Sequence, residues 1–254
     1  MSTHTTLASR LADARSNKIL IDDGPYNRLS STAEAYRLQD LASAAYPSRQ
    51  CGYKVGATSE VAQKLFSCDG PFYGPMFEQD RYEPGAHLEL QKGIVGGEAE
   101  FAFVCGTDFP THTDLAIDDL PDLVSSCHTA VEIVGRRTTG DGLPGLHSAI
   151  ADFGVHVAFI PGPAIANWRT IDLSKIEVTA TTNGIETNSG TGAAVLGHPL
   201  QSLLWMHNAL RSIGSGLKAG DWVSTGTCLG VIAAVPGRVN IEFSGCNTIH
   251  YGFN

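Results

Sequence analysis

Positive charge is scarce in this 254-residue chain, in which 17 Lys and Arg residues stand against 26 Asp and Glu residues and leave a formal net charge of −9. Binding to nucleic acid needs a surplus of cationic side chains, so the composition argues against a DNA or RNA partner. Long apolar runs are missing as well, since no stretch approaches the ~20 residues that cross a bilayer. We therefore expect neither a nucleic-acid partner nor a membrane partner.

Several motifs that mark common enzyme classes are also absent. The sequence contains no Gly-x-Gly-x-x-Gly or Walker-type loop, so a nucleotide cofactor is not expected. It contains no Gly-x-Ser-x-Gly elbow, which argues against a serine hydrolase. The cysteines lack metal-motif and redox-motif spacing, and most lie in apolar runs, so we interpret them as reduced thiols of a cytoplasmic protein. They are Cys51, Cys68, Cys105, Cys127, Cys228 and Cys246.

The first fifty residues carry a helical pattern. The opening segment is rich in Ser, Thr and Arg, a composition that transit peptides share, but its apolar residues recur on one helical face. We therefore favour a first helix over a targeting segment. The helix signals are a stripe at Leu7, Leu11 and Ala14, a capping box from Ser31 to Glu34, and a second stripe at Leu38, Leu41, Ala42 and Tyr46.

From residue 51 onward the pattern becomes rich in strands. Asn183-Gly184 joins two strand-like runs and predicts a hairpin, because both positions of such a tight turn need positive φ. Gly70-Pro71 and Gly74-Pro75 predict a loop. Pro199 and Gly214 bound one late helix. The predicted strands are 51–58, 98–105, 130–134, 156–160, 176–182, 185–189, 231–235, 238–243 and 248–253, with a short helix at 60–66.

These elements predict an α+β fold. A helical section over residues 1–50 precedes a β-rich catalytic domain over residues 51–254, and we expect the two to form one compact unit. The strands suggest a large mixed sheet or a distorted barrel.

The most informative stretch is the alternating segment that begins at Glu98. Because a strand alternates its faces, Glu98 and Glu100 point to one side, while Phe101 and Phe103 point to the other. Two such carboxylates repel each other unless a cation lies between them, although a solvated strand face would also carry this pattern. Glu132 adds weight, because a lone carboxylate in an apolar strand is costly unless it is paired or ligated. Three glutamates would suit a hard divalent cation.

Several short segments, which follow one another along nearly the whole chain, together match the motif order of a known family. They are Gly52-Tyr53-Lys54-Val55-Gly56-Ala57-Thr58, Tyr73-Gly74, Glu98-Ala99-Glu100-Phe101-Ala102-Phe103, Val131-Glu132-Ile133-Val134, the glycine-rich run from Gly190 to Pro199, Leu217-Lys218-Ala219-Gly220-Asp221 and Thr225-Gly226-Thr227. Together these segments resemble the 2-keto-4-pentenoate hydratase branch of the fumarylacetoacetate hydrolase superfamily.

The resemblance implies a β-rich fold of the fumarylacetoacetate hydrolase type with an N-terminal helical section. It also implies a divalent metal, Mg²⁺ or Mn²⁺, at Glu98, Glu100 and Glu132, and an oligomeric assembly. The branch contains vinylpyruvate hydratases and 4-oxalocrotonate decarboxylases, which degrade aromatic compounds. Their small 2-oxo acid substrates can chelate a metal, which then stabilises the enolate formed at the 2-oxygen.

The resemblance further suggests catalytic and substrate-binding residues. Lys54 is the first candidate for a general acid, with a surface lysine as the alternative. Glu78 falls near an acidic position of the family and could shuttle protons, unless it is a solvated loop acid. Thr191, Gly192 and Thr227 could offer donors to a substrate carboxylate, although turn chemistry explains these residues equally well.

The histidines give no metal signal. His147 and His156 have no partner at ligand spacing, and we expect His207 to pack on the late helix rather than to bind metal.

Two departures from the family pattern leave the reaction open. Gly135 stands where the family often has Asp, and Phe153 stands where it often has Asn. Our leading hypothesis is a hydratase of a 2-hydroxy-2,4-dienoate. The alternatives are a 4-oxalocrotonate-type decarboxylase, an acylpyruvate hydrolase that cleaves a C–C bond, and a protein that keeps the metal but has lost turnover.

Overall fold

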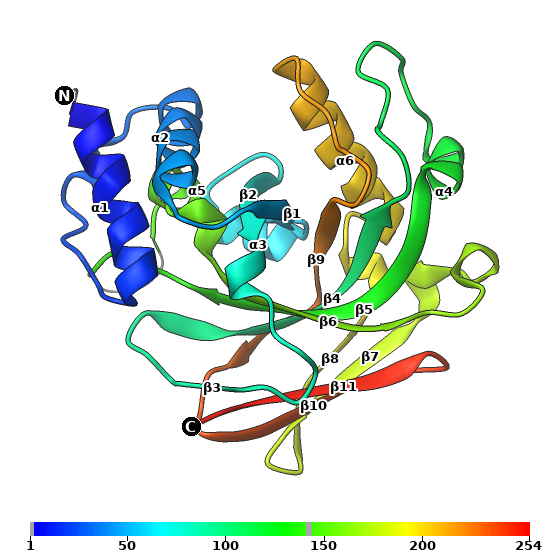
Figure 1. The fold of residues 1–254 in the computed structure, drawn as a ribbon. Helices are drawn as coiled ribbons and strands as arrows, with labels where there is room; N and C mark the ends of the chain where they lie inside the picture. The colour runs from blue at the N-terminus through cyan, green and yellow to red at the C-terminus, as the bar shows by residue number, and fades with distance from the viewer. Residues whose placement is uncertain (1–2, 141–143) are drawn as a thin grey trace.

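The computed structural model describes residues 3–140 and 144–254. Helices precede and interrupt a β-rich body, in which two sheets lie under the helical layer (Figure 1). The helices are α1 (Thr3–Asn17), α2 (Thr32–Ala45), α3 (Glu60–Phe66), α4 (Leu120–Leu123), α5 (Leu146–Ala151) and α6 (Pro199–Ser212). The strands are β1 (Gln50–Gly56), β2 (Phe72–Phe77), β3 (His87–Leu88), β4 (Ile94–Cys105), β5 (Val124–Gly135), β6 (His156–Ala164), β7 (Glu177–Thr182), β8 (Ile185–Thr191), β9 (Trp222–Ala233), β10 (Gly237–Phe243) and β11 (Asn247–Phe253).

Both sheets are mixed. The larger has the strand order β2-β1-β9-β4-β5-β6, in which β1 and β9 are parallel and the other neighbours antiparallel. The smaller has the order β3-β11-β10-β7-β8, with β3 parallel to β11. This arrangement confirms the predicted α+β class with mixed sheets and N-terminal helices.

The two faces of the larger sheet have different neighbours. Phe101 and Phe103 of β4 and Ile133 of β5 are fully buried in the core shared with the smaller sheet, where Ile241 of β10 and Ile249 of β11 also lie. Glu98, Glu100 and Glu132 alternate with these residues and therefore face the opposite side, under the helices. The alternation predicted for the segment that begins at Glu98 is confirmed.

The N-terminal helices pack together as predicted. Leu11 of α1 and Leu38 of α2 are fully buried in one cluster with α5. The Ser31 side chain accepts a hydrogen bond from the Glu34 backbone N–H at 3.2 Å, and the Glu34 carboxylate accepts one from the Ser30 N–H at 2.9 Å. The capping box is therefore present, with its second bond moved back by one residue. The helix prediction for the opening segment is confirmed.

The hairpin prediction is also confirmed, because Asn183 and Gly184 have φ of 53° and 84° and join β7 to β8. The loop predicted at Gly74-Pro75 is wrong, since both residues lie in β2. β2 is an edge strand of its sheet, and an edge position tolerates the missing N–H of proline. Much of β9 was also missed, because Gly226 and Gly230, both at positive φ, interrupt the alternation expected of a strand.

The cysteines are free thiols, in agreement with the sequence analysis. Among the described residues, no helix is both long enough and apolar enough to cross a membrane.

Candidate active site

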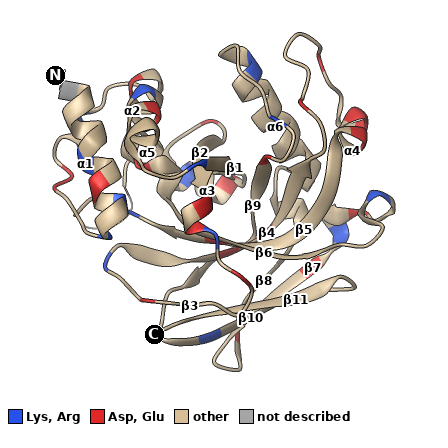
Figure 2. Ribbon diagram, viewed as in Figure 1, with Lys and Arg blue, Asp and Glu red and all other residues tan. Residues whose placement is uncertain are grey.

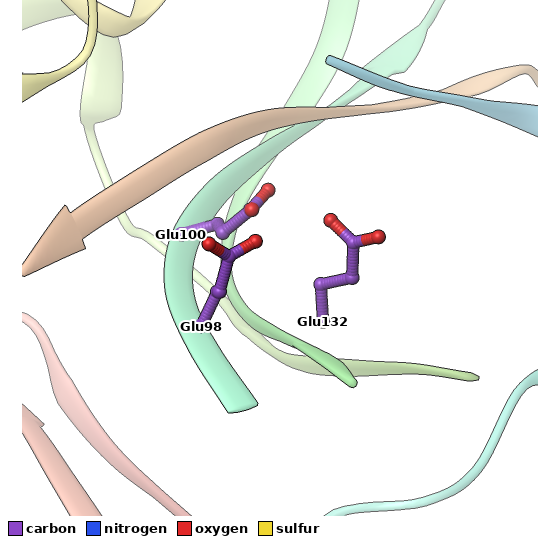
Figure 3. Close-up of side chains that lie close together, drawn as sticks. All are labelled: Glu98, Glu100 and Glu132. Carbon is purple, nitrogen blue, oxygen red and sulfur yellow. The ribbon is translucent and has the colours of Figure 1, made fainter. Parts of the chain in front are cut away.

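Three glutamates meet on the helix-covered face of the larger sheet. Glu98 lies directly opposite Glu132 in the register of β4 and β5, and Glu100 is the next residue along β4 on the same face. The carboxyl groups turn toward one shared space (Figure 3), and one oxygen of each lies within 4.8 Å of the others. Elsewhere the charged residues lie mainly on helices and loops (Figure 2). A cluster of acids inside strands is therefore unusual in this molecule.

The path of β9 supports this cluster. Glu98 pairs with Val231 of β9, and Glu100 pairs with Thr227. β9 therefore advances by four residues where β4 advances by two, so β9 carries extra residues at this point. Bulges of this kind re-aim side chains and are frequent next to active sites. At Gly226, which has φ of 102°, a Cβ would lie 2.1 Å from the Thr58 hydroxyl, so only glycine fits. Gly226 lies in a second register shift, where β9 passes from Thr227 to Ser224, and its backbone N–H reaches the cluster there.

Glu100 is held through one oxygen only. Its Oε2 accepts hydrogen bonds from the Ser224 hydroxyl and, at 2.9 Å, from the Gly226 N–H, both from β9. Its Oε1 is buried and has no hydrogen-bond partner among the described residues. Such an atom is costly unless a ligand satisfies it.

Glu132 shows the same asymmetry. Its Oε1 accepts from the Lys54 ammonium at 3.1 Å and lies 3.0 Å from His156 Nδ1. Its Oε2 is buried and has no partner in the part of the chain that the structure describes. Because an ionised carboxylate only accepts, His156 donates through Nδ1. Burial, followed by the nearby Arg15 guanidinium, holds the pKa of His156 well below its usual value, so the imidazole is neutral.

Lys54 is not the surface lysine that was considered as an alternative. Its side chain is only 2% exposed, and its ammonium also donates to the Gly154 carbonyl at 3.1 Å. Burial acts to lower the pKa of Lys54, but the carboxylates of Glu132, Glu98 and Glu100 outweigh it and raise that pKa above its usual value. Lys54 is therefore a cation at neutral pH.

The charges of this group do not balance. Three carboxylates against one ammonium leave a formal charge of −2, which one divalent cation would cancel. Burial, and then mutual repulsion, raise the pKa of Glu100 well above its usual value, while burial raises the pKa of Glu98 to about 7 and that of Glu132 as well. The charge, the oxygen-only donors and the two unpartnered oxygens all fit a hard divalent cation.

A cavity of about 130 Å³ opens beside the cluster. Lys54 and Glu98 lie in its wall together with Thr227, and most of the remaining wall is apolar, from α3, β2 and the facing parts of β4 and β9. A mainly apolar wall with a few polar groups is typical of a small-molecule site.

The structure separates the other predicted site residues. Thr227 lines the cavity, although its hydroxyl also donates to the Gly230 carbonyl at 2.9 Å. Thr191 and Gly192 are not among the described residues of the cavity wall, and the Gly192 N–H already donates to the Ile176 carbonyl. Glu78 is also outside that wall; it is exposed and forms an ion pair with Arg49. Glu78 begins the short turn that follows β2, so it lies apart from Tyr73 and Gly74 within that strand.

Sequence reasoning missed several residues around the site. His156, Ser224 and Gly154 contact the cluster but belong to no motif with a recognisable spacing. The segment Phe153–Val155 is unusual, since its three residues have φ of 53°, 65° and 57°. Such a conformation is uncommon outside glycine and strained for a β-branched residue. It directs the Gly154 carbonyl to Lys54.

The two departures from the family pattern have structural reasons. At Gly135 a Cβ would lie 2.5 Å from the Gly93 carbonyl oxygen, so the backbone leaves no room for Asp. Phe153 is fully buried and stacks under two guanidinium groups, those of Arg15 and Arg137, at 4.7 and 5.3 Å from its ring centre.

A second buried charge cluster lies behind His156. Arg15 bonds Asp80 through Nε and Nη2 at 3.0 and 2.6 Å, and Arg137 bonds Asp152 through Nη1 at 2.9 Å. Both guanidinium groups also donate to the carbonyl oxygen of His156. The two clusters therefore meet at one residue.

Comparison with known proteins identifies the family. No family model matches the chain. The 2-keto-4-pentenoate hydratase of Burkholderia vietnamiensis strain G4 is 32% identical over 188 residues, which cover 74% of this chain and 71% of that protein. The chain belongs to the 2-keto-4-pentenoate hydratase family. Two further relatives of the chain are named 4-oxalocrotonate decarboxylase.

Solved structures have the fold that the sequence predicted for this chain. The 4-oxalocrotonate decarboxylase from Pseudomonas putida G7, complexed with magnesium and adipate, has a TM-score of 0.90 at 24% identity and covers 99% of this chain and 97% of its own. The fumarylacetoacetate hydrolase from Exiguobacterium antarcticum has a TM-score of 0.57 at 17% identity over 83% of this chain and 76% of its own. The fold of the fumarylacetoacetate hydrolase type is confirmed.

Proposed function

We propose that this protein is a metal-dependent lyase that adds water to a 2-hydroxy-2,4-dienoate. One observation carries the proposal: three converging carboxylates, of which Glu100 and Glu132 are fully buried, outnumber the Lys54 ammonium and leave a formal charge of −2, and Glu98 and Lys54 line a mainly apolar cavity. The membership of the hydratase family supplies the reaction class.

Glu98, Glu100 and Glu132 would hold the cation, and Mg²⁺ or Mn²⁺ suits their oxygen donors. When bound, the ion supplies a Lewis acid for the carboxylate and 2-oxygen of the substrate. In Glu100 and in Glu132, two donors hold one carboxylate oxygen in place, and the other oxygen stays open. The chain has therefore oriented these two ligands before any ion arrives.

Lys54 is our candidate for moving protons. The hydratase reaction first moves a proton from the 2-hydroxyl to C5 of the dienoate, which leaves a C3–C4 double bond conjugated with the 2-oxo group. Water then adds its hydroxyl at C4 and a proton at C3. A buried ammonium at the cavity wall can donate a proton and stabilise negative charge that develops on the substrate. The apolar walls exclude bulk water, and the Thr227 hydroxyl offers a polar contact for the substrate.

The test is a substrate panel with purified protein, with Mg²⁺ or Mn²⁺ and with EDTA. We expect the ultraviolet absorbance of 2-hydroxypenta-2,4-dienoate to decay in the presence of metal and to persist in EDTA. Loss of activity in EDTA should be reversed by added metal. Absence of turnover with every dienoate, despite tight metal binding, would overturn the hydratase assignment and favour a binding protein.

A decarboxylase remains the second candidate, because several relatives carry that name. Release of CO₂ from 4-oxalocrotonate would identify it, and cleavage of an acylpyruvate would identify a C–C hydrolase. The oligomeric assembly and the cytoplasmic location stay predictions from the sequence.

A further inference from the structure

We infer that Phe153 is a positioning residue for catalysis, which acts on Lys54 through the backbone of its neighbour Gly154. Its buried ring holds the segment Phe153–Val155 in a left-handed conformation, and this conformation presents the Gly154 carbonyl to the Lys54 ammonium. The inference rests on the proposed function, because it assumes that Lys54 moves protons. It adds what orients the ammonium.

The Lys54 ammonium has three N–H groups and, among the described residues, two acceptors. Its Nζ lies 3.1 Å from Glu132 Oε1 and donates to the Gly154 carbonyl at 3.1 Å. Because an ammonium is tetrahedral, the bond to Cε and these two contacts fix the direction of the third N–H. Lys54 lines the cavity, so the third N–H is the one available to a substrate. Without the Gly154 carbonyl, this N–H would lose its fixed direction.

Two glycines let the backbone of the segment approach Lys54. Gly74 of β2 lies directly opposite Lys54 in the register of β1 and β2. A Cβ at Gly74 would lie 2.1 Å from the Phe153 carbonyl oxygen, and a Cβ at Gly154 would lie 2.9 Å from Gly74 Cα. The two backbones therefore touch beside Lys54 only because both positions lack a side chain.

The approach depends on an unfavourable backbone conformation. Phe153, Gly154 and Val155 have φ of 53°, 65° and 57°, a region that is costly for phenylalanine and more so for a β-branched valine. Such a conformation persists only where the surrounding packing enforces it. Gly154 has no side chain and Val155 is only partly buried, so the packing that anchors the segment comes from Phe153.

The Phe153 ring is held from several sides. It is fully buried, and the guanidinium carbons of Arg15 and Arg137 lie 4.7 and 5.3 Å from its centre. The centres of the Phe77 and Tyr46 rings lie 5.9 and 6.3 Å away. A smaller side chain would lose these contacts, and the segment could then relax to an ordinary conformation that withdraws the carbonyl from Lys54.

Phe77 provides a matched control. Its ring is also buried and lies 5.0 Å from the Arg15 guanidinium, but it belongs to β2 rather than to the left-handed segment. Phe153→Leu should lower kcat about tenfold to a hundredfold at an almost unchanged KM, because a small misplacement of a catalytic group is costly. Phe77→Leu should leave both constants within about twofold, as an independent site does. An equal loss of kcat in the two variants, or a rise in KM at constant kcat, would overturn the inference.

A double-mutant cycle tests whether Phe153 acts through Lys54. In the Lys54→Met background, Phe153→Leu should change kcat/KM by less than about twofold, because the ammonium that it orients is gone. Losses that multiply in the double variant would show that Phe153 acts on the site by another route, and they would contradict the inference.

A structural readout separates this inference from the proposed function, because it needs no turnover. A crystal structure of Phe153→Leu should show Lys54 Nζ beyond hydrogen-bond distance of the Gly154 carbonyl oxygen, and Phe77→Leu should keep the contact. If the left-handed segment and the contact both survive in Phe153→Leu, the inference is wrong, whatever the wild-type activity. If the contact is lost while the wild type turns over no substrate, the positioning stands and only the proposed function falls. Phe153→Met, with Phe77→Met as its control, is the gentler pair for the same measurements if Phe153→Leu does not fold.

Discussion

Two buried charge clusters lie side by side in this protein, and they differ in whether their bonds are complete. In the first, Arg15 and Arg137 pair with Asp80 and Asp152, so that the charges cancel. In the second, Glu98, Glu100 and Glu132 share one ammonium, and one buried oxygen each of Glu100 and Glu132 has no partner within residues 3–140 and 144–254. Burying a charge is costly unless it is paired. The balanced cluster therefore supports the fold by itself, whereas the unbalanced one needs a cation from outside.

His156 joins the two clusters. Its carbonyl accepts from both guanidinium groups of the balanced cluster, and its ring donates to Glu132 of the other. The balanced cluster thus holds the backbone from which a positioning side chain reaches the candidate metal site. Changes in the first cluster should be measured as stability, and changes in the second as metal affinity and turnover.

The largest effect is expected at Lys54. Lys54→Met should lower kcat/KM by about 10²–10⁴-fold, the range for loss of a general acid. Metal affinity should be unchanged or higher, since the variant keeps all three carboxylates and removes a competing positive charge. Steady-state kinetics and Mn²⁺ calorimetry measure the two quantities. Wild-type turnover in this variant would remove Lys54 from the mechanism.

Breaking the balanced cluster should destabilise the fold. Arg137→Met leaves the buried Asp152 unpaired and should cost about 3–5 kcal/mol in the free energy of unfolding. Urea denaturation measures this loss, and the metal affinity of the folded protein should stay within about twofold. If stability is unchanged but metal affinity collapses, the two clusters do not have the separate roles assigned to them.

The opposite result is expected for the acidic cluster. Glu100→Gln should weaken Mn²⁺ binding by more than about a hundredfold, beyond the range seen for residues that only support a ligand. Stability without metal should not fall, because the variant removes a carboxylate that repels Glu98 and Glu132. Calorimetry and urea denaturation on the same sample test both statements. Unchanged affinity would exclude Glu100 from the ligand set.

His156→Leu tests the connection between the clusters. Loss of the ring donor frees one side of Glu132 and should weaken metal binding about 10–100-fold, while the backbone carbonyl keeps its two arginine partners. Metal titration of the folded variant measures the effect. An unaltered affinity would mean that Lys54 alone orients Glu132.

The smallest effect concerns pH. Burial raises the pKa of Glu98 to about 7, and the other two pKa values are raised as well, so the metal-free folded protein holds protons that the unfolded chain has lost above pH ~4.5. The contribution of these groups to stability is therefore present at low pH and is lost as the pH rises toward about 7. Metal must displace at least the proton of Glu98, so its affinity should fall at least about tenfold per pH unit below about 7.

Mn²⁺ titrations at pH 6, 7 and 8 measure this dependence, and urea denaturation without metal measures the slope of stability. A metal affinity that does not change between pH 6 and 8 would mean that the carboxylates are ionised before the ion binds.

The local features of the site could be predicted from the sequence better than its long-range contacts. The alternation around Glu98 and the apolar surroundings of Glu132 pointed to a cation because strand periodicity and the cost of burying charge are local properties. Lys54 came from the family resemblance, and the structure places it in the cluster. Glu78 stays a prediction from the family resemblance: it follows the end of β2, is exposed and pairs with Arg49.

What the sequence alone determined is most of the elements and the direction in which their side chains point, since periodicity, caps and turn residues act over a few neighbours. What only the tertiary structure decided is which oxygen of each glutamate is bound and which is open. That choice depends on donors from β1, β6 and β9, which approach β4 and β5 from distant parts of the chain. The pairing of these strands is a long-range packing outcome, so no local pattern could have shown it.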